Sequence, residues 1–315
     1  MSKKLLTAVL ILSALLALSF SIASANGGPH GGYTATDDAC AGCHRAHTAS
    51  GPKLLVETST YALCISCHGT AGTGADTNVD DGFFLSTRSA STDGTANTTD
   101  NAPLLGGGFV NYGGVAVTST HDVSGTVGSA WAGLAGNRGV LTAIDANLDC
   151  ASCHDPHGST NYRILNTTVN TAAVTVALVD EGAAKDYDTE QWSTGTSSLC
   201  AACHNAYHKT AAGQGSTLDA GTYTHRVDMP FNYGGNANPE TVGLGGFTLP
   251  LAETGTNNTV VCMTCHLPHG SSSAMTGFAD GGPTGAGIPP GNTIAADSAL
   301  LRLDNRGVCE VCHQK

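Results

Sequence analysis

The pattern Cys-x-x-Cys-His occurs six times in this chain, and the six motifs use every one of its twelve cysteines. Numbered one to six in chain order, they contain Cys40 and Cys43, Cys64 and Cys67, Cys150 and Cys153, Cys200 and Cys203, Cys262 and Cys265, and Cys309 and Cys312. The histidines that directly follow are His44, His68, His154, His204, His266 and His313. A chain with attachment points spread over most of its length has to fold around whatever they hold.

The spacing within each motif is suited to haem. Two thiols three positions apart, on one helical turn, can form two thioethers to the edge of a porphyrin, and the next histidine then reaches the iron. Disulfides in an exported chain and zinc sites are the competing interpretations, but neither requires a histidine after the second cysteine six times. The motifs therefore predict six covalently attached haem c groups, with the motif histidines as proximal iron ligands.

A haem iron has a second axial position, and the chain has enough histidines to fill it. Beyond the motifs lie seven more: His30, His47, His121, His157, His208, His225 and His269. Methionine is the other usual ligand, but only Met229, Met263 and Met275 follow the N-terminal segment, and Met263 sits between two motif cysteines. We expect six low-spin, bis-histidine haems of low potential, with one of the seven candidates in surplus.

Four of these distal candidates lie just after a motif. His47, His157 and His269 each follow the proximal histidine by three residues, and His208 follows His204 by four. A histidine this close cannot pass around its own haem to the opposite face, so it must reach a different iron. This arrangement predicts closely stacked haems. His121 and His225 lie far from any motif and can fold back over a ring.

The composition is unusual for a protein with an ordinary core. Aromatic residues make up 5% of the chain and charged residues 12%, while Gly, Ala, Thr, Ser and Asn fill the long intervals. Such a chain buries little apolar side chain, so the haems must supply much of the core. We expect a mostly irregular fold, with short helices at the motifs and a few short strands, one of them at 169–179. Residues 26–315 form a single hexahaem cytochrome domain.

The N-terminus has the features of a signal peptide. Lys3 and Lys4 precede an apolar run from Leu5 to Phe20, and Ala23-Ser24-Ala25 is typical of a cleavage site. Residues 1–25 are therefore expected to be removed after Sec export. Removal takes two of the 13 basic residues and leaves 11 against 25 acidic ones, a formal charge of −14. This charge argues against nucleic acid as a partner, and no later segment is apolar enough for a membrane span.

The order of these features resembles the hexahaem c-type cytochromes that assemble into extracellular filaments, or nanowires. The shared order begins with His30, a first motif ending in His47 and a second motif without a following histidine, then the lone His121. It continues through Cys-His-Asp-Pro-His-Gly at 153–158, Tyr-Arg-Ile-Leu at 162–165, and His208, and ends with the Arg-flanked His225, His269 and a terminal motif. The resemblance implies a continuous haem chain, parallel-stacked within pairs and T-shaped between them. It also implies that His47 ligates the Cys262/Cys265 haem of the adjacent subunit, a head-to-tail contact that generates open helical fibres.

These features favour a secreted filament that conducts electrons to other redox proteins or external acceptors at the cell surface. A monomeric periplasmic or secreted shuttle is the alternative, and it requires every second ligand to come from one chain. A multihaem reductase needs a haem with an open axial position, often from an altered motif. All six motifs here end in histidine, so we expect an electron-transfer protein and not an enzyme.

Overall fold

The computed structural model describes residues 30, 40–72, 75–85, 102–125, 147–177, 194–204, 207–208, 225–231, 239, 248–253, 258–275, 300–305 and 307–313. The predicted signal peptide lies outside these residues. Within them, no helix is both long and apolar enough to cross a membrane.

Every motif lies on a helix or a helical turn. The α-helices are α2 (Thr60–His68), α3 (Cys150–Cys153), α4 (Thr196–Ala201), α5 (Cys262–Cys265) and α6 (Gly307–His313), and the 3-10 turns are η2 (Cys40–Gly42), η3 (Pro52–Leu54) and η4 (Tyr162–Ile164). Local capping begins several of them: the Ser59 hydroxyl accepts from the Ala62 amide at 3.1 Å, and the Asp149 carboxylate accepts from the Ser152 amide at 3.0 Å. In motif three the His154 amide donates to the Cys150 carbonyl at 3.0 Å, and this single turn sets the spacing of the two thiols.

The strands are two or three residues long and pair in small antiparallel sheets. They are β1 (Thr77–Asn78), β2 (Phe83–Phe84), β3 (Asn111–Tyr112), β4 (Val115–Ala116), β5 (Ser119–Thr120), β6 (Thr168–Val169), β7 (Ala172–Ala173), β8 (Met229–Pro230), β9 (Ala252–Glu253), β10 (Asn258–Val260) and β11 (Gly270–Ser271). The largest sheet has the order β8-β10-β9, and β11 pairs with β5. The strand expected at 169–179 is instead a β6–β7 hairpin, because Asn170 and Thr171 turn the chain at φ 45° and 66°.

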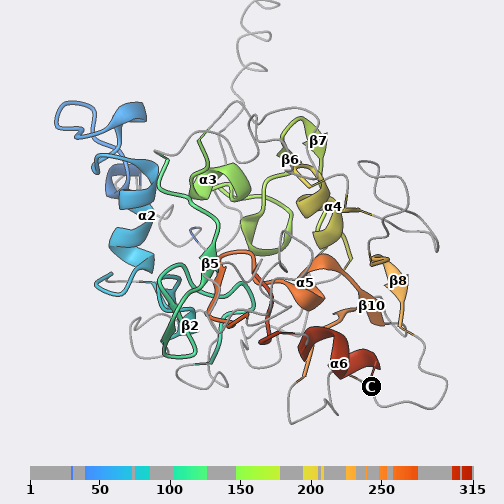
Figure 1. The fold of residues 1–315 in the computed structure, drawn as a ribbon. Helices are drawn as coiled ribbons and strands as arrows, with labels where there is room; N and C mark the ends of the chain where they lie inside the picture. The colour runs from blue at the N-terminus through green and yellow to red at the C-terminus, as the bar shows by residue number, and fades with distance from the viewer. Residues whose placement is uncertain are drawn as a thin grey trace, which may run out of the picture.

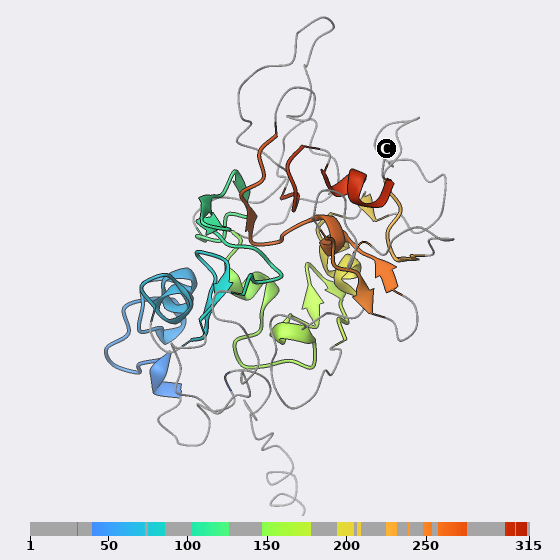
Figure 2. The same cartoon turned by 90° about the horizontal axis from the view of Figure 1, so that it is seen from below.

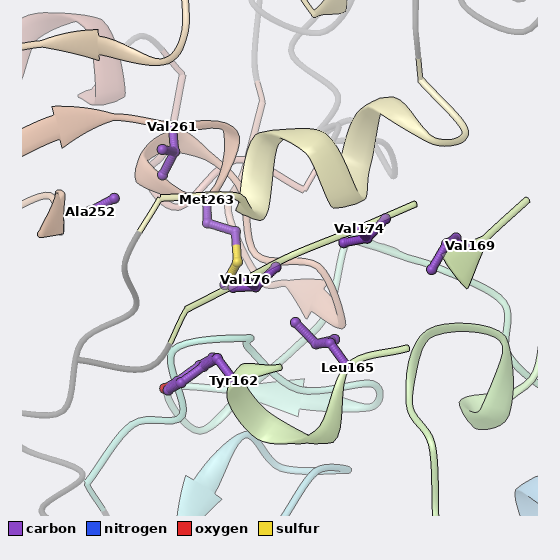
Figure 3. Packing of buried hydrophobic residues seen from close by; sticks show 8 residues of the cluster. All are labelled: Tyr162, Leu165, Val169, Val174, Val176, Ala252, Val261 and Met263. Carbon is purple, nitrogen blue, oxygen red and sulfur yellow. The ribbon is translucent and has the colours of Figure 1, made fainter. Parts of the chain in front are cut away.

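Side chains form only small apolar clusters. The largest joins Tyr162, Leu165, Val169, Val174, Val176, Ala252, Val261 and Met263, and Figure 3 shows it between the segment around η4 and the helices α4 and α5. Two smaller clusters surround Phe84 and Val311. The buried side chains thus hold neighbouring motifs together locally, and the mostly irregular fold with short helices and strands is as the composition predicts.

The motif helices follow one another across the molecule in chain order. In Figures 1 and 2, α2 and α6 lie at opposite ends, with α3, α4 and α5 between them. Helix α2 packs against α3, and α4 packs against α5. The fold therefore sets the six motifs along a single path and does not gather them at one centre.

Candidate functional site

Among the described residues, five pairs of histidine rings lie opposite one another at nearly the same separation. In each pair one member is a motif histidine and the other is a distal candidate. The ring centroids are separated by 6.3 Å in His44–His157, 6.1 Å in His68–His30, 6.3 Å in His154–His269, 6.1 Å in His204–His121 and 6.4 Å in His313–His225.

This separation between ring centroids is the one expected when two imidazoles bind one iron from opposite sides. An imidazole nitrogen binds a transition metal at about 2 Å, and the ring centroid lies about 1.1 Å farther back, which gives roughly 6.3 Å between trans ligands. Direct packing of aromatic rings would allow any separation over a broad range, about 4.5 to 7 Å. The five separations differ by only 0.3 Å between 6.1 and 6.4 Å, so the residues present fit a bis-histidine haem at each pair.

The pairs divide the chain into three units of the same layout. Unit 1 contains His30 with motifs one and two, unit 2 contains His121 with motifs three and four, and unit 3 contains His225 with motifs five and six. In every unit the lone histidine faces the proximal histidine of the second, even-numbered motif. The even sites are thus completed from within their own unit.

The odd-numbered motifs follow a different rule. His157 of unit 2 faces His44 of unit 1, and His269 of unit 3 faces His154 of unit 2. Each histidine that follows an odd motif by three residues therefore faces the odd motif of the preceding unit. The odd sites are shared between consecutive units.

Two distal candidates lie outside the five ring pairs. His47 is exposed on the turn after motif one. His208 lies with its Nε2 atom 2.6 Å from the Asp228 carboxylate, and both side chains are about a quarter exposed. The structure thus places the two candidates in unlike surroundings: His47 faces solvent, and His208 is held by a carboxylate.

The second ring nitrogen of the proximal histidines is held by a segment that returns to the motif. His44 Nδ1 lies 3.0 Å from the Lys53 carbonyl, and His154 Nδ1 lies 2.9 Å from the Arg163 carbonyl. Donation to a backbone carbonyl fixes the tautomer and turns Nε2 toward the metal position. Lys53 and Arg163 both have positive φ, 57° and 52°, which brings their carbonyls under the ring.

All three odd motifs receive this return segment in the same register. The residue after the proximal histidine donates its amide to the segment in the bonds Arg45–Leu54, Asp155–Ile164 and Leu267–Leu300, at 2.8, 2.7 and 2.8 Å. Isolated bridges pair His44 with Leu55, His154 with Leu165 and His266 with Leu301. The fifth motif therefore has the same backbone frame as the first and third, although the chain between motif and return segment is longer.

Sequence reasoning did not identify these orienting groups as functional. The signal was available in Pro52-Lys-Leu-Leu55 and Tyr162-Arg-Ile-Leu165, which follow their proximal histidines at equal distance. At the even site of unit 1 the acceptor is a side chain, because His68 Nδ1 lies 2.7 Å from the Thr77 hydroxyl. Nothing in the spacing of Thr77 marks it as a histidine partner before the β1–β2 hairpin is known.

The cysteine thiols trace a continuous path through the six motifs. The sulfur atoms of Cys64 and Cys150, and of Cys200 and Cys262, lie within hydrogen-bonding contact of each other. The other three junctions are close enough for electrostatic coupling. Burial raises the pKa of Cys43, Cys153 and Cys265, and thiols of motifs two, four and six respectively raise it further. Since a thioether holds the porphyrin edge at its cysteine, haem edges would be neighbours from motif one to motif six.

Burial also keeps several of the paired histidines neutral. Burial, followed by the nearby His121 and His266, lowers the pKa of His204 to about 4. Burial, followed by His154, lowers the pKa of His269 to about 3. A neutral imidazole is the form that binds a metal. The surroundings of these residues therefore favour their ligand state at physiological pH.

A family model described as "Doubled CXXCH motif" matches residues 30–73 and 143–172, which contain motifs one to three. No curated protein matches the chain in sequence. Among solved structures, the chain is similar to the "Outer Membrane Cytochrome S Filament from Geobacter Sulfurreducens", with a TM-score of 0.47 and 17% identity. That match covers 88% of this chain and 98% of the other.

Proposed function

We propose that this multihaem c-type cytochrome is the subunit of an extracellular filament that conducts electrons along a continuous chain of bis-histidine haems. Each of the six motifs would hold one haem c through its two cysteines and its proximal histidine. The haem supplies an iron that cycles between the ferric and ferrous states, one electron at a time. The motif cysteines would hold the groups beside one another in chain order, and the distal histidines would occupy the second ligand positions, which favours conduction over substrate binding.

Five of the second ligands are proposed from the ring pairs. His157, His30, His269, His121 and His225 would complete the haems of motifs one, two, three, four and six. These pairs leave the haem of motif five, on His266, to be assigned between His47 and His208. The choice decides whether the chain acts alone or in a polymer.

The main support for the filament is that the histidine opposite an odd proximal histidine comes from the following unit. The histidine after motif three lies opposite the proximal histidine of motif one, and the histidine after motif five lies opposite that of motif three. The same step applied to motif five requires a following unit that begins with an odd motif and a histidine three residues later. The first unit of a second copy is such a unit, and its exposed His47 occupies the corresponding position. A contact of this head-to-tail kind repeats without closing, which gives a fibre.

The alternative is a monomeric electron shuttle in which His208 serves the fifth haem. His208 lies close enough to Cys262 to influence that thiol's pKa, which places it near motif five. Against this, its Nε2 is engaged with Asp228, and His208 follows an even motif, whereas His157 and His269 both follow odd ones. We therefore favour His47.

Two matched substitutions separate these possibilities. In His47→Ala we expect six haems to remain attached by mass, one high-spin ferric haem by electron paramagnetic resonance, and no fibres in negative-stain images of the secreted fraction. In His208→Ala we expect fibres and a wholly low-spin spectrum. Normal fibres from His47→Ala would overturn the filament proposal, and a new high-spin signal in His208→Ala alone would establish the monomeric shuttle.

A further inference from the structure

In units 1 and 2, the lone histidine of the even site uses its second ring nitrogen to contact the following unit. His30 Nδ1 lies 2.9 Å from the Pro156 carbonyl, and His121 Nδ1 lies 2.6 Å from the Pro268 carbonyl. Pro156 and Pro268 occupy the same place: each directly precedes the histidine that crosses to the odd site of the preceding unit. Two consecutive residues of one unit thus engage both haem sites of the unit before it.

Backbone contacts accompany this histidine contact at the junction between units 2 and 3. The His121 amide donates to the His269 carbonyl at 3.2 Å, and the Thr120 hydroxyl donates to the same carbonyl at 2.7 Å. Strand β5 then continues the pairing with β11. The segment that carries the lone histidine therefore lies along the segment after the odd motif of the next unit.

His225, the lone histidine of unit 3, uses its second ring nitrogen within its own unit. His225 Nδ1 lies 2.7 Å from the carbonyl of the adjacent Arg226, and the residue is exposed. In the filament proposed above, the next unit that could receive this nitrogen is unit 1 of another copy. In unit 1, the residue that precedes the corresponding histidine is Ala46. It takes the place of Pro156 and Pro268 and is exposed on the turn that carries His47.

We propose that the Ala46 carbonyl of one copy accepts a hydrogen bond from His225 Nδ1 of the adjacent copy, in exchange for the Arg226 carbonyl. The inference rests on the filament proposed above and adds a second site to its junction. Ala46 and His47 would engage the even and odd sites of unit 3 together, as Pro156 with His157 and Pro268 with His269 engage units 1 and 2. The occupant of this surface is thus the motif-one turn of a second copy of this chain.

The proposal has a chemical consequence for the sixth haem. A carbonyl that accepts from Nδ1 fixes the orientation of the His225 ring and its basicity as an iron ligand, and in the fibre this carbonyl would belong to the neighbouring copy. His225, the second ligand of the sixth haem, would therefore donate to a different carbonyl in a fibre than in a free subunit. Assembly would adjust the sixth haem without changing which residues ligate it.

Substitutions at Ala46 test the surface because its side chain is exposed and the other two units carry proline there. Ala46→Trp should block the junction by its bulk, so fibres are lost while six haems stay attached to the subunit. Ala46→Pro reproduces the residue of units 2 and 3 and should preserve fibres. Val115→Trp, at a side chain 59% exposed on the β3–β4 hairpin, is the bulk-matched control and should leave fibres intact.

A density map of the wild-type fibre provides the direct measurement. It should place His225 Nδ1 within hydrogen-bonding distance of the Ala46 carbonyl of the adjacent copy. Fibres joined through His47 in which His225 remains on Arg226, or normal fibres from Ala46→Trp, would overturn this inference and leave the proposed function standing. Fibres that persist in His47→Ala would instead overturn the proposed function and this inference with it.

Discussion

The proximal histidines of odd-numbered and even-numbered motifs lie opposite histidines from different parts of the chain. At the even sites a lone histidine returns to a motif of its own unit, as His121 does to His204. At the odd sites the histidine comes from the following unit, as His269 does to His154. The ring pairs of the even motifs lie within one unit, whereas those of the odd motifs span two consecutive units.

The supporting contacts follow the same division. The proximal histidines of motifs one and three are oriented by backbone carbonyls of a return segment, which do not depend on side-chain identity. The even histidine His68 is oriented by a side chain, the Thr77 hydroxyl. The histidines of motifs one and three are thus oriented by backbone atoms, whereas His68 is oriented by a side chain that a substitution can remove.

The sharpest way to break this comparison is to remove one ligand of each kind. We expect His269→Ala to lower the free energy of unfolding by about 4 kcal/mol, the upper range for one residue, because it separates unit 3 from unit 2. His121→Ala would remove the same number of coordination bonds and the Nδ1 contact to the Pro268 carbonyl of unit 3, but the β5–β11 pairing between the two units would remain, so we expect a loss of about 2 kcal/mol. Thermal unfolding followed at the Soret band measures both, and an equal or larger loss in His121→Ala would contradict the division.

The third odd site differs from the other two in carrying a buried charge. Arg302 donates Nε to the Met263 carbonyl and Nη2 to the Leu105 carbonyl, both at 2.8 Å. The Arg302 amide donates to the Cys265 carbonyl, and the amides of Val56 and Asn166 donate in the same way to the second cysteines of motifs one and three. Arg302 therefore occupies a position that is uncharged in the other two units. Burial lowers the pKa of Arg302 to about 10, so it stays charged at neutral pH.

Arg302→Met sharpens the comparison among the odd sites. It removes a positive charge beside the fifth haem, so we expect that haem's potential to fall by tens of millivolts. The two carbonyls lose their donors, and we expect unfolding to be easier by about 2 kcal/mol. Redox titration and thermal unfolding measure the two effects. Arg302→Lys keeps the charge but not the paired donors, so it should keep the potential and lose stability.

The smallest expected effect concerns the even site of unit 1. Thr77→Val removes the hydroxyl at His68 Nδ1 and should reduce stability by about 1 kcal/mol, with a small shift in one haem potential. Thr77→Ser retains the hydroxyl and should behave as wild type. Identical results for Val and Ser would show that the hydroxyl does not orient His68.

Much of this architecture could be predicted from the residues. The cysteine motifs identify the attachment points, and the scarcity of large apolar side chains predicts the irregular fold. Steric exclusion at a three-residue spacing predicts that His157 and His269 face other motifs. The choice of motif could not be predicted, because it depends on how loops of very different length fold back. The carbonyls of Lys53 and Arg163 leave no trace in residue identity, and only the equal spacing of their two segments after the proximal histidines points to them.

The displacement of the odd ligands by one unit also sets an order in time. In a chain exported with its N-terminus first, His44 would emerge long before His157, and His154 long before His269. Each even site can be completed as soon as its own unit has emerged, whereas each odd site must wait for the next one. Maturation would therefore advance in steps of one unit, with the latest odd site always the last to close.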